Sequence, residues 1–211
     1  MASEEQAVAG RQAAPERAPG LRARLTLRLA AMRKSRRRGW VLAALALWKG
    51  QRILQIGFGT GADIVRVRRL TEPAVVCGID ASPQMLTVAW RRFRKACAEG
   101  EVRLQCCAAS ALPYDDASFD RVFAISGPGL WHDADPAGTE LARVLRPAGR
   151  TVVAIECGAG EPEANLRRLS ARIVEALVRN GVTVVDVAWH DEVRPLMVCI
   201  VGIKVWTTPT A

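Results

Sequence analysis

The chain has 211 residues, of which 50% are hydrophobic, enough for one domain with a substantial core and an extension. No apolar run reaches the roughly twenty residues that a membrane span needs, because the run before Lys49 is broken there by polar residues. The net charge of +9 is concentrated between residues 11 and 38 and is not interleaved with stacking aromatics. We therefore expect neither a membrane span nor sequence-specific nucleic acid binding.

We assign residues 1–38 to an N-terminal extension and residues 39–211 to the domain. Residues 1–20 are rich in Ala, Pro, Glu and Gln, a composition typical of disorder. From Leu21 to Met32, leucines recur at helical spacing among arginines, which predicts a short basic amphipathic helix. Three roles are open for this helix: a lid or docking helix, a membrane-surface or targeting segment, and a solvated face without a role.

Beyond Gly39, helical and extended segments alternate. Hydrophobic periodicity predicts helices over 41–48, 62–70, 83–99, 137–145 and 165–180, and strands over 52–56, 75–79, 102–107, 119–126, 151–156, 182–189 and 195–206. Ser82 is the expected N-cap of the third helix, with Pro83 at its first position. The last two strands are close enough in sequence to pair antiparallel. The sum is an α/β fold with a mostly parallel, doubly wound sheet and an antiparallel terminal hairpin.

The most informative segment runs from a first strand through a glycine turn and a helix to a second strand that ends in Asp80. Gly57, Gly59 and Gly61 let the backbone approach a ligand where a Cβ would clash. Asp80 stands where a carboxylate accepts both ribose hydroxyls in nucleoside-binding βαβ units. Glycines also serve tight strand–helix turns without any ligand, so the position of Asp80 carries the argument. We predict that this unit binds an adenosine.

Four motifs follow one another along the chain, at residues 53–61, 78–86, 111–122 and 140–150. In this order they resemble the class I S-adenosylmethionine-dependent methyltransferases, of the small-molecule type related to quinone-biosynthesis methyltransferases. The resemblance covers nearly everything from residue 39 to residue 204. It implies a Rossmann-like, seven-stranded sheet whose last strand is antiparallel. It also implies that S-adenosylmethionine binds across the carboxyl ends of the first strands and that its methyl group goes to a small organic acceptor.

The resemblance further implies which residues surround the cofactor. The glycine loop lines its methionine and ribose portion, and Asp80 holds the ribose hydroxyls. Two residues neighbour the adenine, one closes over that ring after the third strand, and two at the end of the fourth strand face the methionine part. In chain order the expected cofactor-binding residues are Gly57, Phe58, Gly59, Gly61, Asp80, Ala81, Met85, Leu112, Ile125 and Ser126.

Two positions depart from the family pattern. Gln55 stands where Glu or Asp is usual, and Ala108 stands where an Asp commonly accepts from the adenine amino group. These departures motivate an alternative in which the protein binds the cofactor without transferring a methyl group, as a scaffold or in a rearrangement. A third alternative is an NAD(P)-dependent oxidoreductase, since Gly57, Gly59 and Ala62 also satisfy the dinucleotide pattern.

The chemistry asks for little beyond a positioned nucleophile and the exclusion of water. A base helps when the acceptor must lose a proton, and His132, just beyond the fourth strand, is our candidate. Trp131 would offer a face for a cationic or planar group. The other interpretation of His132 is a surface loop residue or one bonded to a nearby carbonyl. We expect His190 in a solvated turn.

The remaining polar and sulfur residues suggest no metal. Asp115 and Asp116 fit a turn before the fourth strand better than a metal cluster. The six cysteines form no CxxC pair and have no histidine at ligand spacing, so we interpret them as small core residues of a cytoplasmic protein in a reducing compartment. Exposed tryptophans near either terminus would indicate a homodimer, which is left open.

Overall fold

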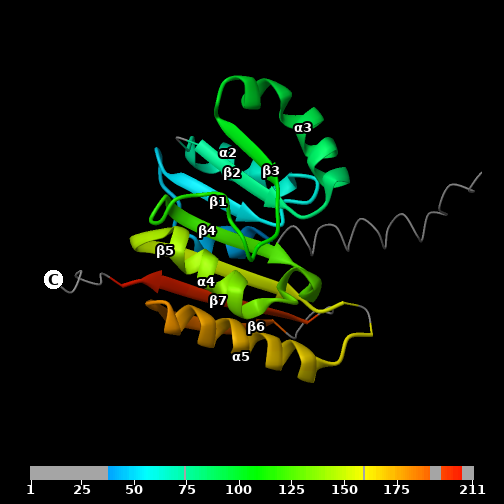
Figure 1. The fold of residues 1–211 in the computed structure, drawn as a ribbon, viewed down its shortest axis with the longest axis vertical. Helices are drawn as coiled ribbons and strands as arrows, with labels where there is room; N and C mark the ends of the chain where they lie inside the picture. The colour runs from blue at the N-terminus through cyan, green and yellow to red at the C-terminus, as the bar shows by residue number, and fades with distance from the viewer. Residues whose placement is uncertain (1–37, 74, 159, 191–195, 206–211) are drawn as a thin grey trace, which may run out of the picture. The chain divides into compact units, whose positions relative to one another are not determined.

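The computed structural model describes residues 38–73, 75–158, 160–190 and 196–205. Residues 1–37, which include the expected amphipathic helix, lie outside the described residues. All described residues belong to one compact unit, Arg37–Ala211. In this unit a seven-stranded sheet lies between two layers of helices (Figure 1).

The strand order is β3-β2-β1-β4-β5-β7-β6. Strands β1 to β5 pair in parallel, whereas β7 runs antiparallel to both β5 and β6. This confirms the predicted seven-stranded, mostly parallel, Rossmann-like sheet with an antiparallel last strand. The strands are β1 Arg52–Ile56, β2 Val75–Asp80, β3 Val102–Cys106, β4 Phe119–Ser126, β5 Leu145–Glu156, β6 Val182–His190 and β7 Met197–Lys204.

Helices cover both faces of the sheet. The helical residues 38–44 pack with α2 (Ala62–Thr71) and α3 (Pro83–Ala98) against one face. On the other face lie α4 (Ala134–Val144) and α5 (Glu163–Arg179), preceded by the short 3-10 helix η1 (Pro128–Trp131). No helix connects β3 to β4; an irregular segment, residues 107–118, covers the sheet there.

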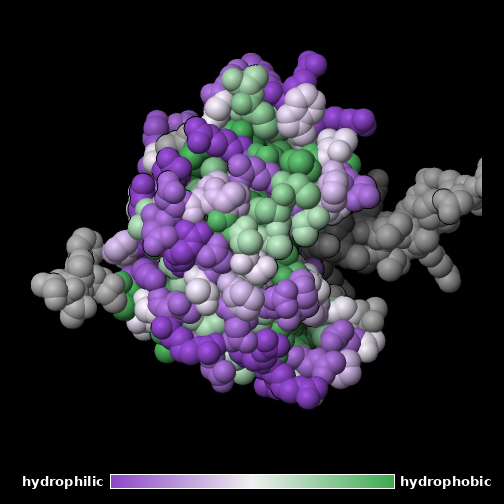
Figure 2. All heavy atoms as spheres, in the orientation of Figure 1, coloured by the Kyte–Doolittle hydropathy of each residue, from purple (hydrophilic) through white to green (hydrophobic). Residues whose placement is uncertain are grey.

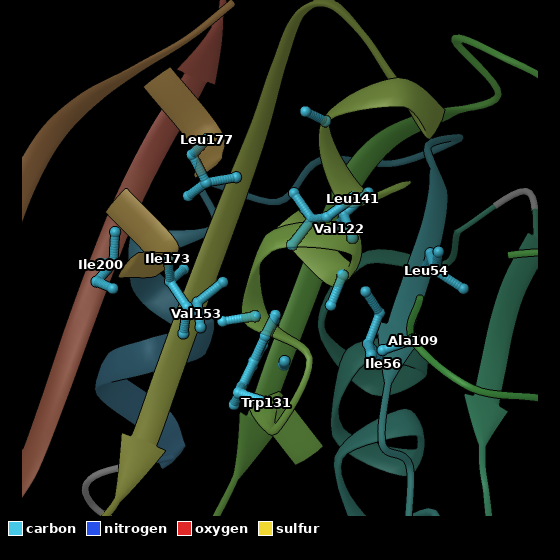
Figure 3. Packing of buried hydrophobic residues seen from close by; sticks show 14 of the residues in the cluster. Leu54, Ile56, Ala109, Val122, Trp131, Leu141, Val153, Ile173, Leu177 and Ile200 are labelled. Atoms are coloured by element: carbon cyan, nitrogen blue, oxygen red, sulfur yellow. The ribbon is translucent and has the colours of Figure 1, made fainter. Parts of the chain in front are cut away.

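The core on the α4/α5 face is shown in Figure 3. Trp131 is fully buried among Val153 of β5 and Ile173 of α5. The helices α4 and α5 approach closely because Gly138 has no side chain: a Cβ on it would lie 2.6 Å from the Cβ of Ala176. Full burial of one large apolar side chain stabilises the fold by roughly 1.5–3 kcal/mol. Because Trp131 is the last residue of η1, its burial in this layer fixes the position of η1.

The predicted start of α3 is confirmed. The Ser82 hydroxyl accepts a hydrogen bond from the Met85 backbone N–H at 3.3 Å, and Pro83 is the first helical residue. This cap satisfies one of the four N–H groups that a helix leaves free at its start. The helix therefore begins three residues after Asp80, at the carboxyl edge of the sheet.

The helix predicted over 41–48 ends at residue 44, so the prediction was wrong for residues 45–48. The Arg121 guanidinium accounts for the early stop, because it donates to the carbonyl of Leu45 at 2.7 Å and to that of Ala46 at 3.2 Å. It also lies 4.1 Å from the centre of the Trp48 ring. The side chain of a β4 residue, 75 positions from Ala46 in sequence, thus binds the carbonyl groups that would accept backbone hydrogen bonds in a longer helix.

The boundary between α4 and β5 also differs from the prediction. The helix begins at Ala134 instead of 137, and β5 begins at Leu145 instead of 151. Pairing starts at Phe119 with Leu145 and resumes at Arg121 with Arg150, so residues 146–149 form an irregularity inside the strand. Arg146 holds this segment through an ion pair with Asp120 at 2.8 Å.

Two further expectations were wrong. His190 does not lie in a solvated turn: β6 extends to it, and it pairs with Met197 of β7. Its ring packs edge-on against Trp40, with centroids 4.5 Å apart. Among the cysteines, which are all free thiols, Cys77, Cys157 and Cys199 are buried as expected, but Cys106 is exposed at the end of β3.

Candidate functional site

The candidate site lies at the carboxyl edge of the sheet, where β1 and β2 end. The backbone N–H of Gly57, directly after β1, donates to the carbonyl of Ile79 at 2.8 Å. This bond ties the glycine loop to the end of β2, and Asp80 follows at once. In open parallel sheets, ligands bind in the crevice at this edge.

The Asp80 carboxylate is held in place by two backbone donors. One oxygen, Oδ2, accepts from the N–H of Gly59 at 2.8 Å, and the other, Oδ1, accepts from the N–H of Ser82 at 3.0 Å. The residue is half-buried. A carboxylate oxygen has two lone-pair directions, so each oxygen keeps one for a hydroxyl group. The carboxylate is thus oriented to accept from two neighbouring hydroxyls.

Gly59 and Gly61 play different parts, although both adopt left-handed backbone angles, with φ of 53° and 76°. A Cβ on Gly59 would meet no atom within 4 Å, so the space above it is open to a ligand. A Cβ on Gly61 would lie 2.4 Å from the Phe93 ring of α3. Gly61 therefore serves the packing of α3 against the loop, and Gly59 is the glycine that a ligand can approach.

Gln55 is a buried polar residue of β1, two positions before the first glycine of the loop. The side chain is 1% exposed, and its Oε1 has no hydrogen-bond partner among the residues that the structure describes. An unpaired buried acceptor costs roughly 1–3 kcal/mol, which a ligand donor would recover. The carboxylate of Asp80, the open face of Gly59 and this free acceptor together fit a nucleoside that also carries an N–H donor, as S-adenosylmethionine does in its ammonium group.

Leu130 lies over the start of the loop and was not foreseen. Its Cδ2 is 3.1 Å from the position that a Cβ on Gly57 would occupy. The neighbouring Trp131 anchors η1 because it is fully buried and its Nε1 donates to the Ser126 hydroxyl at 3.2 Å. The only signal in the sequence was the Pro-Gly-Leu-Trp run after β4, which does not reveal the direction of one leucine.

The other expected cofactor residues fall into two groups. Ala81 and Met85 lie at the start of α3 next to Asp80, exposed and half-buried respectively. Phe58 and Ile125, by contrast, are 3% and 6% exposed and pack in the core of the α2/α3 face. The Phe58 side chain lies under β2, 2.9 Å from where a Cβ on Gly78 would be. Phe58 therefore brings its backbone, not its ring, to the loop.

Leu112 is held by a charged pair from α4. Its N–H donates to Glu140 Oε2 at 2.7 Å, and its carbonyl accepts from Arg143 at 3.1 Å. Arg143 also donates to the Tyr114 carbonyl at 2.7 Å, so this pair fixes the irregular segment before β4. The hydrogen bond from Arg143 lowers the pKa of Glu140, with the Leu112 N–H acting in the same direction against burial.

His132, the candidate base, follows η1 and has a side chain that is 74% exposed. Its Nδ1 lies 3.3 Å from the Gly129 carbonyl, and its Nε2 lies 2.9 Å from Asp133 Oδ2. Together with Trp131 and with Arg168 of α5 it lines a hollow of about 360 Å³. These contacts agree with the second interpretation of His132, a surface residue near a carbonyl, and they leave its part in catalysis a prediction.

A glycine loop between β1 and α2, a carboxylate at the end of β2 and the observed sheet order define a nucleoside-binding unit of the Rossmann-like class. Residues 53–149 match the family model described as a methyltransferase domain. This match confirms the resemblance of the four motifs to methyltransferases.

Curated relatives agree with this match. The chain is 32% identical over 145 residues to an O-methyltransferase, rstn1, of Aspergillus nomiae, which covers 67% of this chain and 63% of that protein. It is 42% identical over 111 residues to a demethylmenaquinone methyltransferase of Thermus thermophilus, which covers 52% of this chain and 49% of that protein. The chain spans about half the length of the curated relatives that it matches.

Solved structures share the fold. A geranyl diphosphate methyltransferase in complex with S-adenosylmethionine superposes with a TM-score of 0.71 at 18% identity, covering 92% of this chain and 93% of the other. The [4+2]-cyclase SpnF superposes with a TM-score of 0.66 at 22% identity, covering 82% of each chain. At these identities the likeness concerns the fold, which accommodates proteins with different reactions.

Proposed function

We propose that this protein is an S-adenosylmethionine-dependent methyltransferase that acts on a small organic acceptor. The observation that carries the proposal is the Asp80 carboxylate, oriented by the Gly59 N–H at 2.8 Å beside an open glycine face. The match of residues 53–149 to a methyltransferase domain and the names of the curated relatives support it. Bound S-adenosylmethionine supplies an electrophilic methyl group, so the protein must chiefly bind, orient and keep water out.

Each part of the site has a role in this proposal. Asp80 accepts the ribose hydroxyls, and Gln55 Oε1 accepts from the ammonium group of the methionine end. Leu130 and the buried Trp131 form an apolar wall beyond β4 that excludes water. The irregular segment that Glu140 and Arg143 hold brings Leu112 toward the adenine side.

His132 remains our candidate for a base that removes a proton from a hydroxyl or amine acceptor. The hollow that it lines beside Arg168 has room for a small molecule. The Nε2 of His132 lies 2.9 Å from the Asp133 carboxylate, so this contact must break before Nε2 can accept a proton from the acceptor. If His132 is the base, His132→Ala removes the pH dependence of turnover; an unchanged pH profile would retire the assignment.

Calorimetric titration tests the cofactor site. We expect wild-type protein to bind S-adenosylmethionine and S-adenosylhomocysteine and to give no heat with NAD. Asp80→Asn keeps the size of the side chain but removes its charge, and we expect about tenfold to a hundredfold weaker binding of both ligands. Asp186→Asn, in an exposed residue of β6, is the matched control and should bind like wild type. Equal affinity of the Asp80 variant would contradict the proposal.

Turnover separates transfer from binding alone. Because relatives are named as O-methyltransferases and a demethylmenaquinone methyltransferase, phenols and quinols are the first acceptors to test. Release of S-adenosylhomocysteine that depends on the acceptor supports methyl transfer. Tight cofactor binding without release for any acceptor favours the alternative of a binding or rearrangement protein, which the departures at Gln55 and Ala108 motivated. Binding of NAD instead would favour the oxidoreductase.

We propose a cytoplasmic location, since the six cysteines are free thiols. Among the described residues, no helix has both the length and the apolar character to cross a bilayer. The homodimer stays a prediction; sedimentation velocity of the purified chain would test it.

A further inference from the structure

The outer face of α3 is the feature that the proposed function leaves unexplained. The helix buries Ala89, Phe93 and Ala96 against the sheet. Its other side presents a tryptophan, Trp90, that is 52% exposed, although a residue of this size is usually covered. We call Trp90, Arg91, Arg94 and Lys95, all exposed, the α3 surface.

The charges of the α3 surface are of one sign and largely unpaired. Arg91 and Arg94 have no ion-pair partner within the described part of the chain, and Lys95 reaches only Glu99, at 3.7 Å. Arg92, next to them, donates to the Thr60 carbonyl at 3.2 Å and keeps its charge. Residues three and four apart lie together on a helix, which groups Arg91 with Arg94 and Lys95, and Trp90 with Arg94. An exposed indole thus lies among three cations, two of which have no ion-pair partner within the described part of the chain.

We propose that the α3 surface docks on an anionic lipid bilayer. Tryptophan favours the boundary between headgroups and acyl chains, because its ring is apolar and its N–H is polar. Clusters of Arg and Lys are attracted to the anionic headgroups of a bilayer. The exposed Val88, 45% accessible, adds apolar area on the same helix.

Nucleic acid is the other polyanion that a basic surface attracts, and the structure favours it less. Binding to single strands uses several aromatic faces along a groove, on which successive bases stack. Trp90 is the one exposed aromatic side chain on α3. In Figure 2, hydrophilic side chains project outward at the upper right, where Figure 1 shows α3.

Vesicle binding of the full-length chain tests this docking and needs no enzymatic activity, so its outcome is independent of the proposed function. We would measure co-sedimentation with vesicles of phosphatidylglycerol and phosphatidylcholine, and with phosphatidylcholine alone. Each basic residue near an anionic surface contributes about fivefold in partitioning, so Arg91→Gln with Arg94→Gln should bind about 25-fold more weakly. The matched control changes two arginines of α5, on the opposite face of the sheet: Arg168→Gln with Arg179→Gln.

Insertion of the indole is measured by quenching with brominated lipids. Wild-type fluorescence should be quenched on anionic vesicles, and Trp90→Phe should lose most of the quenching while it keeps the fold, as judged by circular dichroism. Equal vesicle binding by the α3 and control variants would overturn the proposal and assign binding to other basic residues. Binding of a labelled oligonucleotide that depends on Arg91 and Arg94, without vesicle binding, would overturn it in favour of nucleic acid.

Discussion

At the scale of single residues, Gly59 and Gly61 should respond differently to the same substitution. Alanine at either position must adopt a left-handed angle, which costs roughly 1–2 kcal/mol. At Gly61 the new Cβ also meets the Phe93 ring, an overpacking that adds roughly 1–3 kcal/mol. We therefore expect Gly61→Ala to lower the free energy of unfolding clearly more than Gly59→Ala in urea titrations.

For cofactor affinity, measured on the folded fraction of each variant, we expect the opposite order: Gly59→Ala should have the larger effect. Gly59→Ala places a methyl group on the open face of the loop, beside the N–H that holds Asp80, and should weaken S-adenosylmethionine binding strongly. Phe93→Leu replaces the ring that Gly61 faces with a smaller side chain. In this background, Gly61→Ala should lower the free energy of unfolding by less than it does in the wild-type protein. If Gly61→Ala were as stable as Gly59→Ala, the assignment of Gly61 to packing would be wrong.

Part of this candidate site follows from the local sequence, and part depends on distant contacts. Asp80 and the glycine loop could be found because their geometry follows from one local unit, a strand, a turn and a strand. Leu130 could not, since its place over Gly57 depends on the burial of Trp131 against α5 and β5. The different roles of Gly59 in ligand approach and of Gly61 in packing could not be predicted either, because they depend on where α3 places Phe93.

At the scale of elements, the boundaries that depend on neighbouring residues could be predicted, whereas contacts with distant residues shifted others from their predicted positions. Ser82 and Pro83 fixed the start of α3 because capping involves neighbouring residues only. The end of the helix before β1 was misplaced because Arg121, far along the chain, binds the carbonyls of Leu45 and Ala46. The early start of β5 has the same kind of cause, an ion pair between Arg146 and Asp120 of β4.

The pair of Glu140 and Arg143 on α4 gives an element-scale prediction. Arg143→Met removes the bonds to Glu140 and to the carbonyls of Leu112 and Tyr114, so we expect a loss of about 1.5–3 kcal/mol at pH 7 in urea unfolding. The pKa of Glu140 is lowered in the folded state, chiefly by the hydrogen bond from Arg143. The stability gained from this carboxylate is therefore present above its unfolded pKa of about 4.3 and is lost as the pH falls through the lower folded pKa.

The difference between wild type and Arg143→Met should accordingly narrow as the pH drops below about 4. Arg172→Met is the control, because its ion pair with Asp135 is exposed on both sides and should matter little at either pH. A difference that stayed constant from pH 7 to pH 3 would mean that Arg143 acts through the carbonyl groups alone.

At the scale of the whole molecule, the packing of the helical residues 38–44 and the turn after them sets which residues the domain needs before β1. Val41, Leu42 and Leu45 are at most 3% exposed and belong to the core of the α2/α3 face. Arg38 extends the same contact through an ion pair with Asp63 at 3.3 Å. A fragment of residues 37–211 keeps all of these contacts, and we expect it to unfold in one cooperative transition.

A fragment of residues 50–211 should behave very differently, although it retains all seven strands. It loses three buried apolar side chains at roughly 1.5–3 kcal/mol each, a sum comparable with the total stability of a small domain, roughly 5–15 kcal/mol. We expect it to lack a cooperative thermal transition and to bind a hydrophobic dye. If it instead melted like the longer fragment, the segment before β1 would be an appendage and the sheet with its later helices would be the complete folding unit.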